Sequence, residues 1–367
     1  MSLILKSTPK EDGYWMPAEW HPHKQTWMHW PERTDTWRLG AKPGQAAYVR
    51  VAKAIAEFEP VTVCASTNQF ENASAMLSHP NIRVIELCQD DAWIRDSGPT
   101  FVINGKGGLR GVDWQFNAYG GMVNGLYFPW DKDDQVAHKV LAIEGCDRYR
   151  TEGFVTEGGS IHTDGEGTAM ICAEPFLSPG RNPSMSSDQM ENYLKDYMNV
   201  EKVLWVPRGI YNDETSGHID NMAFFIRPAE VVLAWTDDKN DPQYERSLEA
   251  YEFLTSQTDA KGRSITVSKL PVPSPMHTTA EDSLGLDISD TAKNREPGDR
   301  LAGSYINCLI CNKGLIVPKY GDPNDDVAAN IMQDLMPDHK VVQVDSREIL
   351  LGGGNIHCIT QQQPLAT

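Results

Sequence analysis

The sequence predicts an α/β protein built from repeated units, and three observations support this fold class. Apolar residues recur at helical spacing in several segments of the chain. Short runs rich in β-branched and aromatic residues, which are typical of strands, lie between those segments. Polar turns that contain glycine return about every 60 residues, each of them directly before such a run. With 367 residues, the chain is long enough to bury a large core.

Helices are predicted where apolar residues would share one face. The five segments with this spacing are 47–58, 134–143, 188–198, 243–254 and 325–335. The last one begins with Asp325 and Asp326, and negative charge near a helix N-terminus is stabilising. Strands are predicted in the runs 61–64, 82–87, 101–103, 202–206, 222–226, 231–235, 265–270, 315–317 and 340–344. The alternation of the two element types indicates an α/β architecture.

The turns that contain glycine also share a register. Asp96 and Glu157 are 61 residues apart, and Glu157 and His218 are again 61 apart. Tyr305 follows His218 by 87 residues, and Cys358 follows Tyr305 by 53. The chain therefore fits five units of about 60 residues once a polar, Pro-rich insertion is set aside.

That insertion spans residues 273–300 and is predicted to be a loop within a single domain that covers residues 1–367. Units of such a period form radial or solenoid arrays. In a closed radial array, equivalent strands meet at one axis, so the residues that set the register would converge there. The alternative is that the Gly-rich turns recur by coincidence.

Composition and charge argue against some classes of function. The net charge of −18 disfavours nucleic-acid binding and attachment to anionic membranes. No apolar run is long enough to span a bilayer and the N-terminus lacks a signal-peptide pattern, so a cytoplasmic location is expected. The acidic balance would attract a small cation, although it would equally keep an ordinary protein soluble.

The seven cysteines are scattered, which suits a reducing compartment better than a disulfide framework. Cys308 and Cys311 form a CxxC motif in an apolar run, and without a second such motif a zinc or redox role is disfavoured. Cys358 follows a turn with three glycines, which allow the backbone close to a partner. This cysteine is either a nucleophile or a small buried hydrophobic residue.

A base for Cys358 is expected from elsewhere in the chain. His357 is adjacent, but neighbouring side chains of a strand point to opposite faces. His218 and Asp220 are two residues apart, which would place them on one face of a strand. They are candidates for a general acid–base and a substrate-binding carboxylate, or else for a structural pair.

Further carboxylates surround these candidates. Three of them flank Trp93 within segment 90–96, and Glu157 precedes two glycines. Carboxylates raise the pKa of a nearby thiol, so beside Cys358 they are useful only for a cationic substrate. A planar guanidinium offers paired N–H groups to carboxylates and keeps its central carbon within reach of sulfur.

Four segments carry a resemblance to a known family, namely 93–99, 157–159, 217–221 and 352–363. They resemble the agmatine deiminases, guanidino-modifying enzymes of the pentein superfamily in the bacterial peptidylarginine-deiminase-like branch. The similarity runs nearly end to end, from residues 16–20 to the C-terminal cysteine motif. It implies a pseudo-fivefold propeller of five ββαβ blades, with the active site on the central axis.

The resemblance also implies a role for each candidate. Cys358 would be the nucleophile that forms a covalent amidino-thioether, and His218 would be the general acid–base. Asp96 and Asp220 would bind the guanidinium, while Glu157 would orient His218 or help to hold substrate. The substrate channel would be lined by Trp93, Glu214, Gly353 and Gly354. Ser216 departs from the family pattern, where many relatives carry Asn or Asp, and leaves that contact open.

The implied reaction is hydrolysis of a small cationic guanidino substrate, agmatine, to N-carbamoylputrescine and ammonia, without a metal ion or organic cofactor. Glu214 and the acidic segment around Trp93 favour the terminal ammonium of agmatine over the carboxylate of arginine. The alternatives are a deiminase of arginine or peptidyl-arginine, an amidinotransferase, and a non-catalytic propeller that only binds a partner. A homo-oligomer is expected, because symmetric assembly is common among enzymes.

Overall fold

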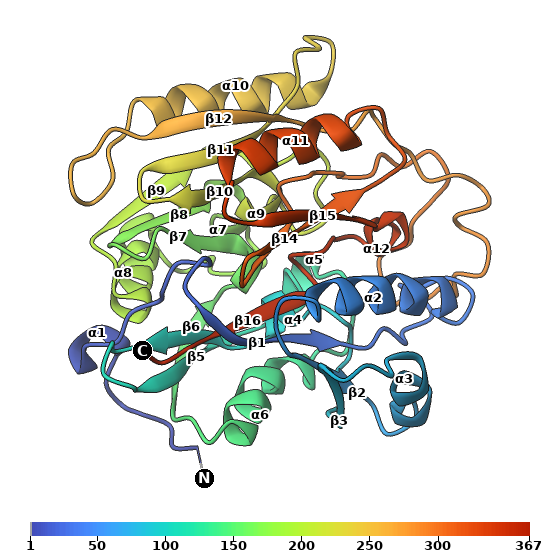
Figure 1. Cartoon of the computed structure of the whole chain (residues 1–367), viewed down its shortest axis with the longest axis horizontal. Helices are drawn as coiled ribbons and strands as arrows, with labels where there is room; N and C mark the ends of the chain where they lie inside the picture. Colours follow the sequence, from blue (N-terminus) through green and yellow to red (C-terminus); the bar gives the residue numbers. More distant parts are fainter. Residues whose placement is uncertain (1) are drawn as a thin grey trace.

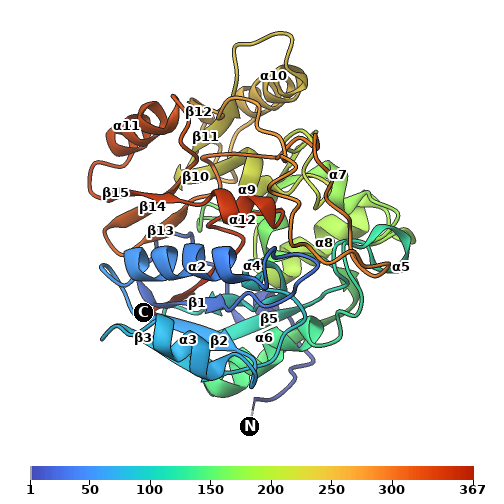
Figure 2. The same cartoon turned by 90° about the vertical axis from the view of Figure 1, so that its right-hand side faces the viewer.

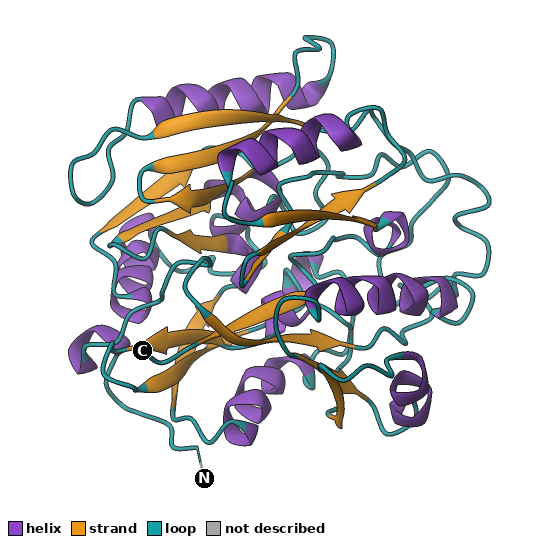
Figure 3. Ribbon diagram, viewed as in Figure 1, coloured by secondary structure: helices purple, strands orange, loops and turns teal. Residues whose placement is uncertain are grey.

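The structure, a computed structural model, describes residues 2–367 and confirms the predicted α/β class. Strands and helices alternate along the chain, and the strands of the described residues form five separate sheets (Figures 1 and 3). Helices α10 and α11 lie at one end of the molecule, and α3 and α6 lie at the other (Figure 2). Among residues 2–367, no helix combines the length and the apolar character that a membrane span requires.

One unit shows how each sheet is built. Strand β4 (Thr100–Ile103) pairs antiparallel with β5 (Leu109–Gln115), and α6 (Val136–Ile143) then leads to β6 (Arg148–Val155). Strand β6 pairs parallel with β5. A crossover helix is needed at this point because a hairpin turn cannot connect two parallel strands.

Three further units repeat the order strand, strand, helix, strand. Their bounds are β7 (Ile161–Thr163), β8 (Thr168–Cys172), α8 (Ser187–Met198) and β9 (Lys202–Val206); β10 (Ala223–Arg227), β11 (Glu230–Trp235), α10 (Pro242–Thr255) and β12 (Thr266–Pro271); β13 (Leu309–Cys311), β14 (Gly314–Lys319), α11 (Asp325–Leu335) and β15 (Lys340–Asp345). In each unit the first two strands are antiparallel and the last two are parallel.

The fifth unit joins the two ends of the chain. Strand β16 (Thr360–Pro364) pairs antiparallel with β1 (His23–His29), and α2 (Lys42–Ile55) connects β1 to the parallel strand β2 (Val61–Ala65). The sheet is completed by α3 (Phe70–Met76) and β3 (Ile82–Glu86). The predicted repeat is therefore present as ββαβ units in the described residues.

The remaining helices are short and lie in the connections: α1 (Pro9–Asp12), α4 (Ile94–Ser97), α5 (Gly121–Asn124), η1 (Asp133–Gln135), η2 (Gly158–Ser160), α7 (Ala173–Phe176), α9 (Ile219–Met222) and α12 (Arg347–Leu351). The five predicted helices correspond to α2, α6, α8, α10 and α11, although Phe58 lies beyond the end of α2. The nine predicted strands are all confirmed. Other strands, such as β1 and β8, lie outside the nine predicted runs.

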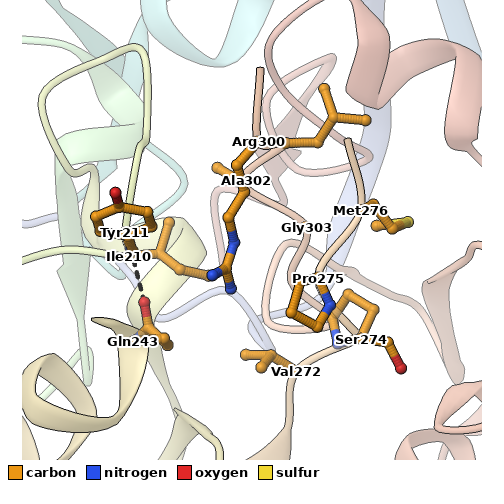
Figure 4. Close-up of a pocket in the computed structure, with 12 residues that line it drawn as sticks. Ile210, Tyr211, Gln243, Val272, Ser274, Pro275, Met276, Arg300, Ala302 and Gly303 are labelled. Carbon is orange, nitrogen blue, oxygen red and sulfur yellow. Dashed lines mark hydrogen bonds between the residues drawn. The ribbon is translucent and has the colours of Figure 1, made fainter. Parts of the chain in front are cut away.

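The inserted loop 273–300 begins and ends at one small pocket (Figure 4). Arg300 forms an ion pair with Asp241 at 2.8 Å, and its guanidinium lies 5.3 Å from the ring centroid of Tyr211. These contacts fix the base of the loop. From this base the loop, orange in Figure 2, extends toward α5. Its residues Thr291 and Lys293 form backbone hydrogen bonds with residues 126–128, the segment that follows α5.

Candidate active site

The candidate residues lie at equivalent places in the five units, directly before the first strand of each. They are Asp96 in α4, Glu157 before η2, His218 and Asp220 at the start of α9, and Cys358 before β16. In the fourth unit this place, before β13, is taken by Asn307, which the sequence did not single out. Because the units are alike, these turns lie together, and side-chain contacts connect all of them. The structure thus brings together Asp96, Glu157, His218, Asp220 and Cys358.

His218 lies between two carboxylates. Its Nδ1 is 3.7 Å from Oδ1 of Asp96, and its Nε2 is 3.4 Å from Oε2 of Glu157. Burial lowers the pKa of His218, but the carboxylates outweigh this effect and raise it to about 9. His218 is therefore an imidazolium at neutral pH, and it holds a proton that it can give to a leaving group.

Asp96 is fixed by two donors. The hydroxyl of Tyr119 donates to Oδ2 at 2.8 Å, and the backbone N–H of Gly159 donates to Oδ1 at 2.8 Å. Burial raises the pKa of Asp96 to about 6, although His218 acts in the opposite direction. Asp96 is therefore ionised at neutral pH and keeps a defined orientation.

Gly159 is the point where three catalytic candidates meet. A Cβ at this position would lie 2.8 Å from Oδ1 of Asp96, 2.8 Å from Oδ2 of Asp220 and 2.8 Å from Nδ1 of His218. No side chain fits such a space without moving these groups. The turn after Glu157 therefore contains glycine because polar side chains approach its backbone from other units.

The guanidinium of Arg181 holds the carboxylate of Glu157 in place. Its Nε donates to Oε1 of Glu157 at 3.1 Å, and its Nη1 donates to Oγ of Ser216 at 3.1 Å. Burial raises the pKa of Glu157, but Arg181 and His218 outweigh this and hold it below its usual value. Ser216 thus contacts the arginine that fixes Glu157.

Cys358 is buried beside a donor and a carboxylate. Nδ2 of Asn307 donates to Sγ at 3.1 Å, and Oδ2 of Asp220 lies 3.5 Å from Sγ. Burial raises the pKa of the thiol well above its usual value, and Asp220 and Asp96 add to the rise. In this environment the cysteine is a neutral thiol until a cation enters.

Two predictions of local structure were wrong here. His218 and Asp220 lie at a single helical turn, α9, rather than on one face of a strand. His357 and Cys358 lie in a turn before β16, so they do not point to opposite faces of a strand. Both side chains contact Oδ2 of Asp220, His357 through Nδ1 at 2.9 Å and Cys358 through Sγ at 3.5 Å.

A small cavity opens onto Cys358. It is lined by Thr36, Asp91, Trp93, Asp96, Tyr119, Leu126, Tyr127, Glu214, Thr215, Arg295, Gly352, Gly353, Gly354 and Cys358. Trp93 stacks on Trp37 with ring centroids 5.2 Å apart, and its Nε1 donates to Asp91. At Gly354, a Cβ would lie 2.6 Å from the Trp93 ring. The absence of a side chain at Gly354 therefore leaves room for the ring of Trp93, which forms part of the cavity wall.

Glu214 faces the cavity as predicted, but it is not a free carboxylate. Arg295 donates to both of its oxygens, at 3.1 and 2.6 Å, and Lys293 lies 3.4 Å away. Burial raises the pKa of Glu214, but Arg295 and Lys293 outweigh it and lower the value. Arg295 belongs to the inserted loop, so the loop supplies part of the cavity wall.

The sequence did not single out several residues of the site. These are Tyr119, Arg181, Arg295, Asn307 and His357. The sequence repeat could have indicated Asn307, because it lies in the turn of the fourth unit, two residues after Tyr305, which sets the register there. His357 precedes the candidate nucleophile, but the assumption of strand geometry removed it from consideration.

A buried thiol, an imidazolium and three carboxylates lie together, and two of these groups, Cys358 and Asp96, line a small cavity. Such a site suits a cysteine nucleophile and a cationic substrate. The chain belongs to the Porphyromonas-type peptidyl-arginine deiminase family, which it matches over residues 15–364. It is 58% identical to an agmatine deiminase of Ectopseudomonas mendocina over 360 residues, 98% of each chain. It is 59% identical over 358 residues to an agmatine deiminase of Pseudomonas aeruginosa, covering 98% of this chain and 97% of that one.

A solved structure agrees with these relatives. The structure described as agmatine deiminase of Enterococcus faecalis catalyzing its reaction is 50% identical to this chain. It has a TM-score of 0.97, and all of both chains is covered. The resemblance predicted from the four sequence segments is therefore confirmed along the whole chain.

Proposed function

We propose that the protein is an agmatine deiminase, which hydrolyses agmatine to N-carbamoylputrescine and ammonia. The observation that carries this proposal is the pairing of a nucleophile with carboxylates: Asp220 lies 3.5 Å from Sγ of Cys358. A carboxylate in that place opposes thiolate formation unless the substrate supplies positive charge. The agmatine deiminases among the relatives support the choice of agmatine.

The reaction begins with substrate binding. Asp96 and Asp220 bind the guanidinium, and its positive charge lowers the pKa of Cys358, which loses its proton to solvent. The sulfur then attacks the guanidinium carbon and forms an S–C bond. Asn307 donates to the sulfur and, before the attack, stabilises the thiolate.

His218 completes the first half of the reaction. The C–N bond to the departing nitrogen breaks, and ammonia leaves with the proton of the His218 imidazolium. The neutral His218 then takes a proton from water, whose oxygen attacks the carbon of the amidino-thioether. The S–C bond breaks and Cys358 leaves as a thiolate, and the added oxygen loses its remaining proton to solvent, which gives the neutral ureido product. Glu157 orients His218 throughout.

We infer that the five ββαβ units form the blades of a pseudo-fivefold propeller within one domain of residues 1–367. The pairing of β16 with β1 supports this arrangement, because it joins the chain ends within one sheet. The contacts among the turns that precede the first strands support an active site on the central axis. A homo-oligomer remains a prediction.

The substrate is also proposed on grounds of charge. Arg295 could in principle bind the carboxylate of arginine, but Glu214 already occupies its guanidinium. The aromatic ring of Trp93, which lines the cavity, favours the aliphatic chain and ammonium of agmatine. Arginine and peptidyl-arginine are therefore the competing substrates for a test.

The test is ammonia release by the purified protein from agmatine, free arginine and a peptidyl-arginine, with the products identified by mass spectrometry. We expect agmatine to be the best substrate and N-carbamoylputrescine to be the product. Faster release from arginine or the peptide contradicts the assignment. Transfer of the amidino group to an added amine in place of hydrolysis would indicate an amidinotransferase.

A further inference from the structure

His357 lies between two buried carboxylates behind the catalytic site. Its Nδ1 is 2.9 Å from Oδ2 of Asp220, and its Nε2 is 2.8 Å from Oε1 of Glu19. All three side chains are buried. Glu19 belongs to the segment before β1, so the contact connects the N-terminal part of the chain to the turn that carries Cys358.

The two contacts define the protonation state of His357. An ionised carboxylate only accepts hydrogen bonds, so each ring nitrogen must donate. Both nitrogens carry a proton only in the imidazolium. Burial and Arg95 oppose the charge, but Glu19 and Asp220 outweigh them and raise the pKa of His357 above its usual value.

Glu19 is itself held in place by other groups. Nη1 of Arg95 lies 3.5 Å from its Oε1, and Nε2 of His162 lies 3.7 Å from the same oxygen. Burial raises the pKa of Glu19, but His357, His162 and Arg95 outweigh this effect and hold it well below its usual value. Arg95 precedes the catalytic candidate Asp96 in α4, and its Nε donates to the carbonyl of His357 at 3.3 Å.

The two carboxylate oxygens of Asp220 have different surroundings. Oδ2 is shared by His357 and the sulfur of Cys358, whereas Oδ1 is buried without a hydrogen-bond partner among the described residues. A carboxylate fixed through one oxygen by a charged donor presents the other oxygen in one direction. Oδ1 is therefore the atom available to a guanidinium N–H.

We propose that His357 and Glu19 are positioning residues that hold Oδ2 of Asp220 in place and direct its Oδ1 at the substrate guanidinium. This inference rests on the proposed function, because it requires Asp220 to bind the guanidinium. His357 does not touch the substrate. Its effect on catalysis passes through Asp220.

The first experiment compares two substitutions of His357. Asn places its amide N–H near the position of Nδ1, whereas Gln places it near Nε2, so H357N keeps a donor to Asp220 and H357Q keeps only the donor to Glu19. We expect kcat/KM for agmatine to fall about 10-fold in H357N and about 100-fold or more in H357Q, as expected for weakening or losing a charged hydrogen bond. Equal losses, or the reverse order, overturn the proposal.

The second experiment measures binding without turnover. In a Cys358→Ala background, isothermal titration calorimetry with agmatine gives its dissociation constant directly. We expect H357Q to weaken binding about 10-fold or more, and to add less than about 2-fold once Asp220→Asn is present, because coupled residues are not additive. If H357Q weakens agmatine binding by the same factor with and without Asp220→Asn, the proposal is overturned.

Two controls separate this role from a structural one. Asp113→Asn disrupts a different buried ion pair, in which Nη1 of Arg150 lies 2.9 Å from Oδ1 of Asp113 between strands β5 and β6. It should lower Tm and leave the kinetics of agmatine hydrolysis unchanged. Glu19→Gln should reduce kcat/KM even where its Tm matches that of Asp113→Asn, and unchanged kinetics in Glu19→Gln overturn the proposal.

Nitrogen-15 NMR of the imidazole ring distinguishes this inference from the proposed function. His357, assigned through its loss in H357N, should have two protonated ring nitrogens at neutral pH in the free enzyme. A neutral tautomer overturns the proposal even if agmatine is hydrolysed. Absence of agmatine turnover with a charged His357 contradicts the proposed function instead.

Discussion

Oδ2 of Asp220 lies 3.5 Å from Sγ of Cys358, so the candidate nucleophile has a carboxylate as its neighbour. Desolvation and this carboxylate both favour the neutral thiol. A reactive cysteine usually has cations around it, and here the nearest partners are Asn307 and Asp220. Neither of these two partners carries positive charge, so we expect the charge that stabilises the thiolate to arrive with the substrate.

Alkylation of Cys358 should depend on the charge of the reagent. Iodoacetamide, which is neutral, should react slowly with the free enzyme. A haloacetamidine, whose amidinium resembles the guanidinium, should react faster by on the order of 100-fold, because it brings its own charge and is attracted by the carboxylates. Inactivation rates and peptide mapping measure both reactions, with Cys358→Ala as the control for other cysteines. Equal rates contradict a substrate-assisted thiolate.

The pH profile of kcat/KM should have two limbs. Asp96 must be ionised to bind a guanidinium, and its pKa of about 6 sets the acidic limb, with activity lost as the pH falls through that value. His218 must be protonated to release ammonia, and its pKa of about 9 sets the alkaline limb, with activity lost as the pH rises. Steady-state kinetics across both values test this, with circular dichroism in the same buffers to exclude unfolding. A profile that still rises above pH 9 contradicts the role of His218.

Gly159→Ala should reduce activity more than it reduces stability. The added Cβ would approach Asp96, Asp220 and His218 to 2.8 Å, and small displacements of catalytic groups cost about 100-fold in rate. The matched control is Gly153→Ala, where nothing lies within 4 Å and φ is +78°. That variant should lose about 1 kcal/mol of stability from backbone strain and keep its kinetics. Similar kinetics in both variants would remove Gly159 from the site.

Glu214→Gln should shift the preference between agmatine and arginine. The substitution removes the negative charge that occupies Arg295 and leaves this guanidinium free to bind a carboxylate. We expect the ratio of kcat/KM for agmatine to that for arginine to fall about tenfold, the size of one charged hydrogen bond. Measuring both substrates on both proteins tests this. An unchanged or higher ratio shows that Arg295 does not affect specificity.

Much of the fold could be predicted because its signals are local. The helices α2 and α11 have apolar residues on one face, and each unit contains a polar turn with glycine before a strand. Five repetitions of a similar unit made the period visible despite low identity between the units. Asp96, Glu157, His218 and Cys358 were found because each occupies the same place within its unit.

Other parts of the site depend on contacts that no local pattern contains. Arg295 reaches Glu214 only because a loop of 28 residues folds back over the cavity. His357 and Asp220 come from turns in different units, and strand geometry gave the wrong direction for His357. The order of the units was readable from the sequence, but the orientation of side chains within the turns was not.

The most direct test of the account is to identify the covalent intermediate. The enzyme is mixed with agmatine, the reaction is quenched in acid within one turnover, and the protein is digested and analysed by mass spectrometry. The account predicts an added mass equal to agmatine minus ammonia on the peptide that contains Cys358, and no adduct in Cys358→Ala. Turnover of agmatine without this adduct, or an adduct on another residue, would contradict the central role of Cys358.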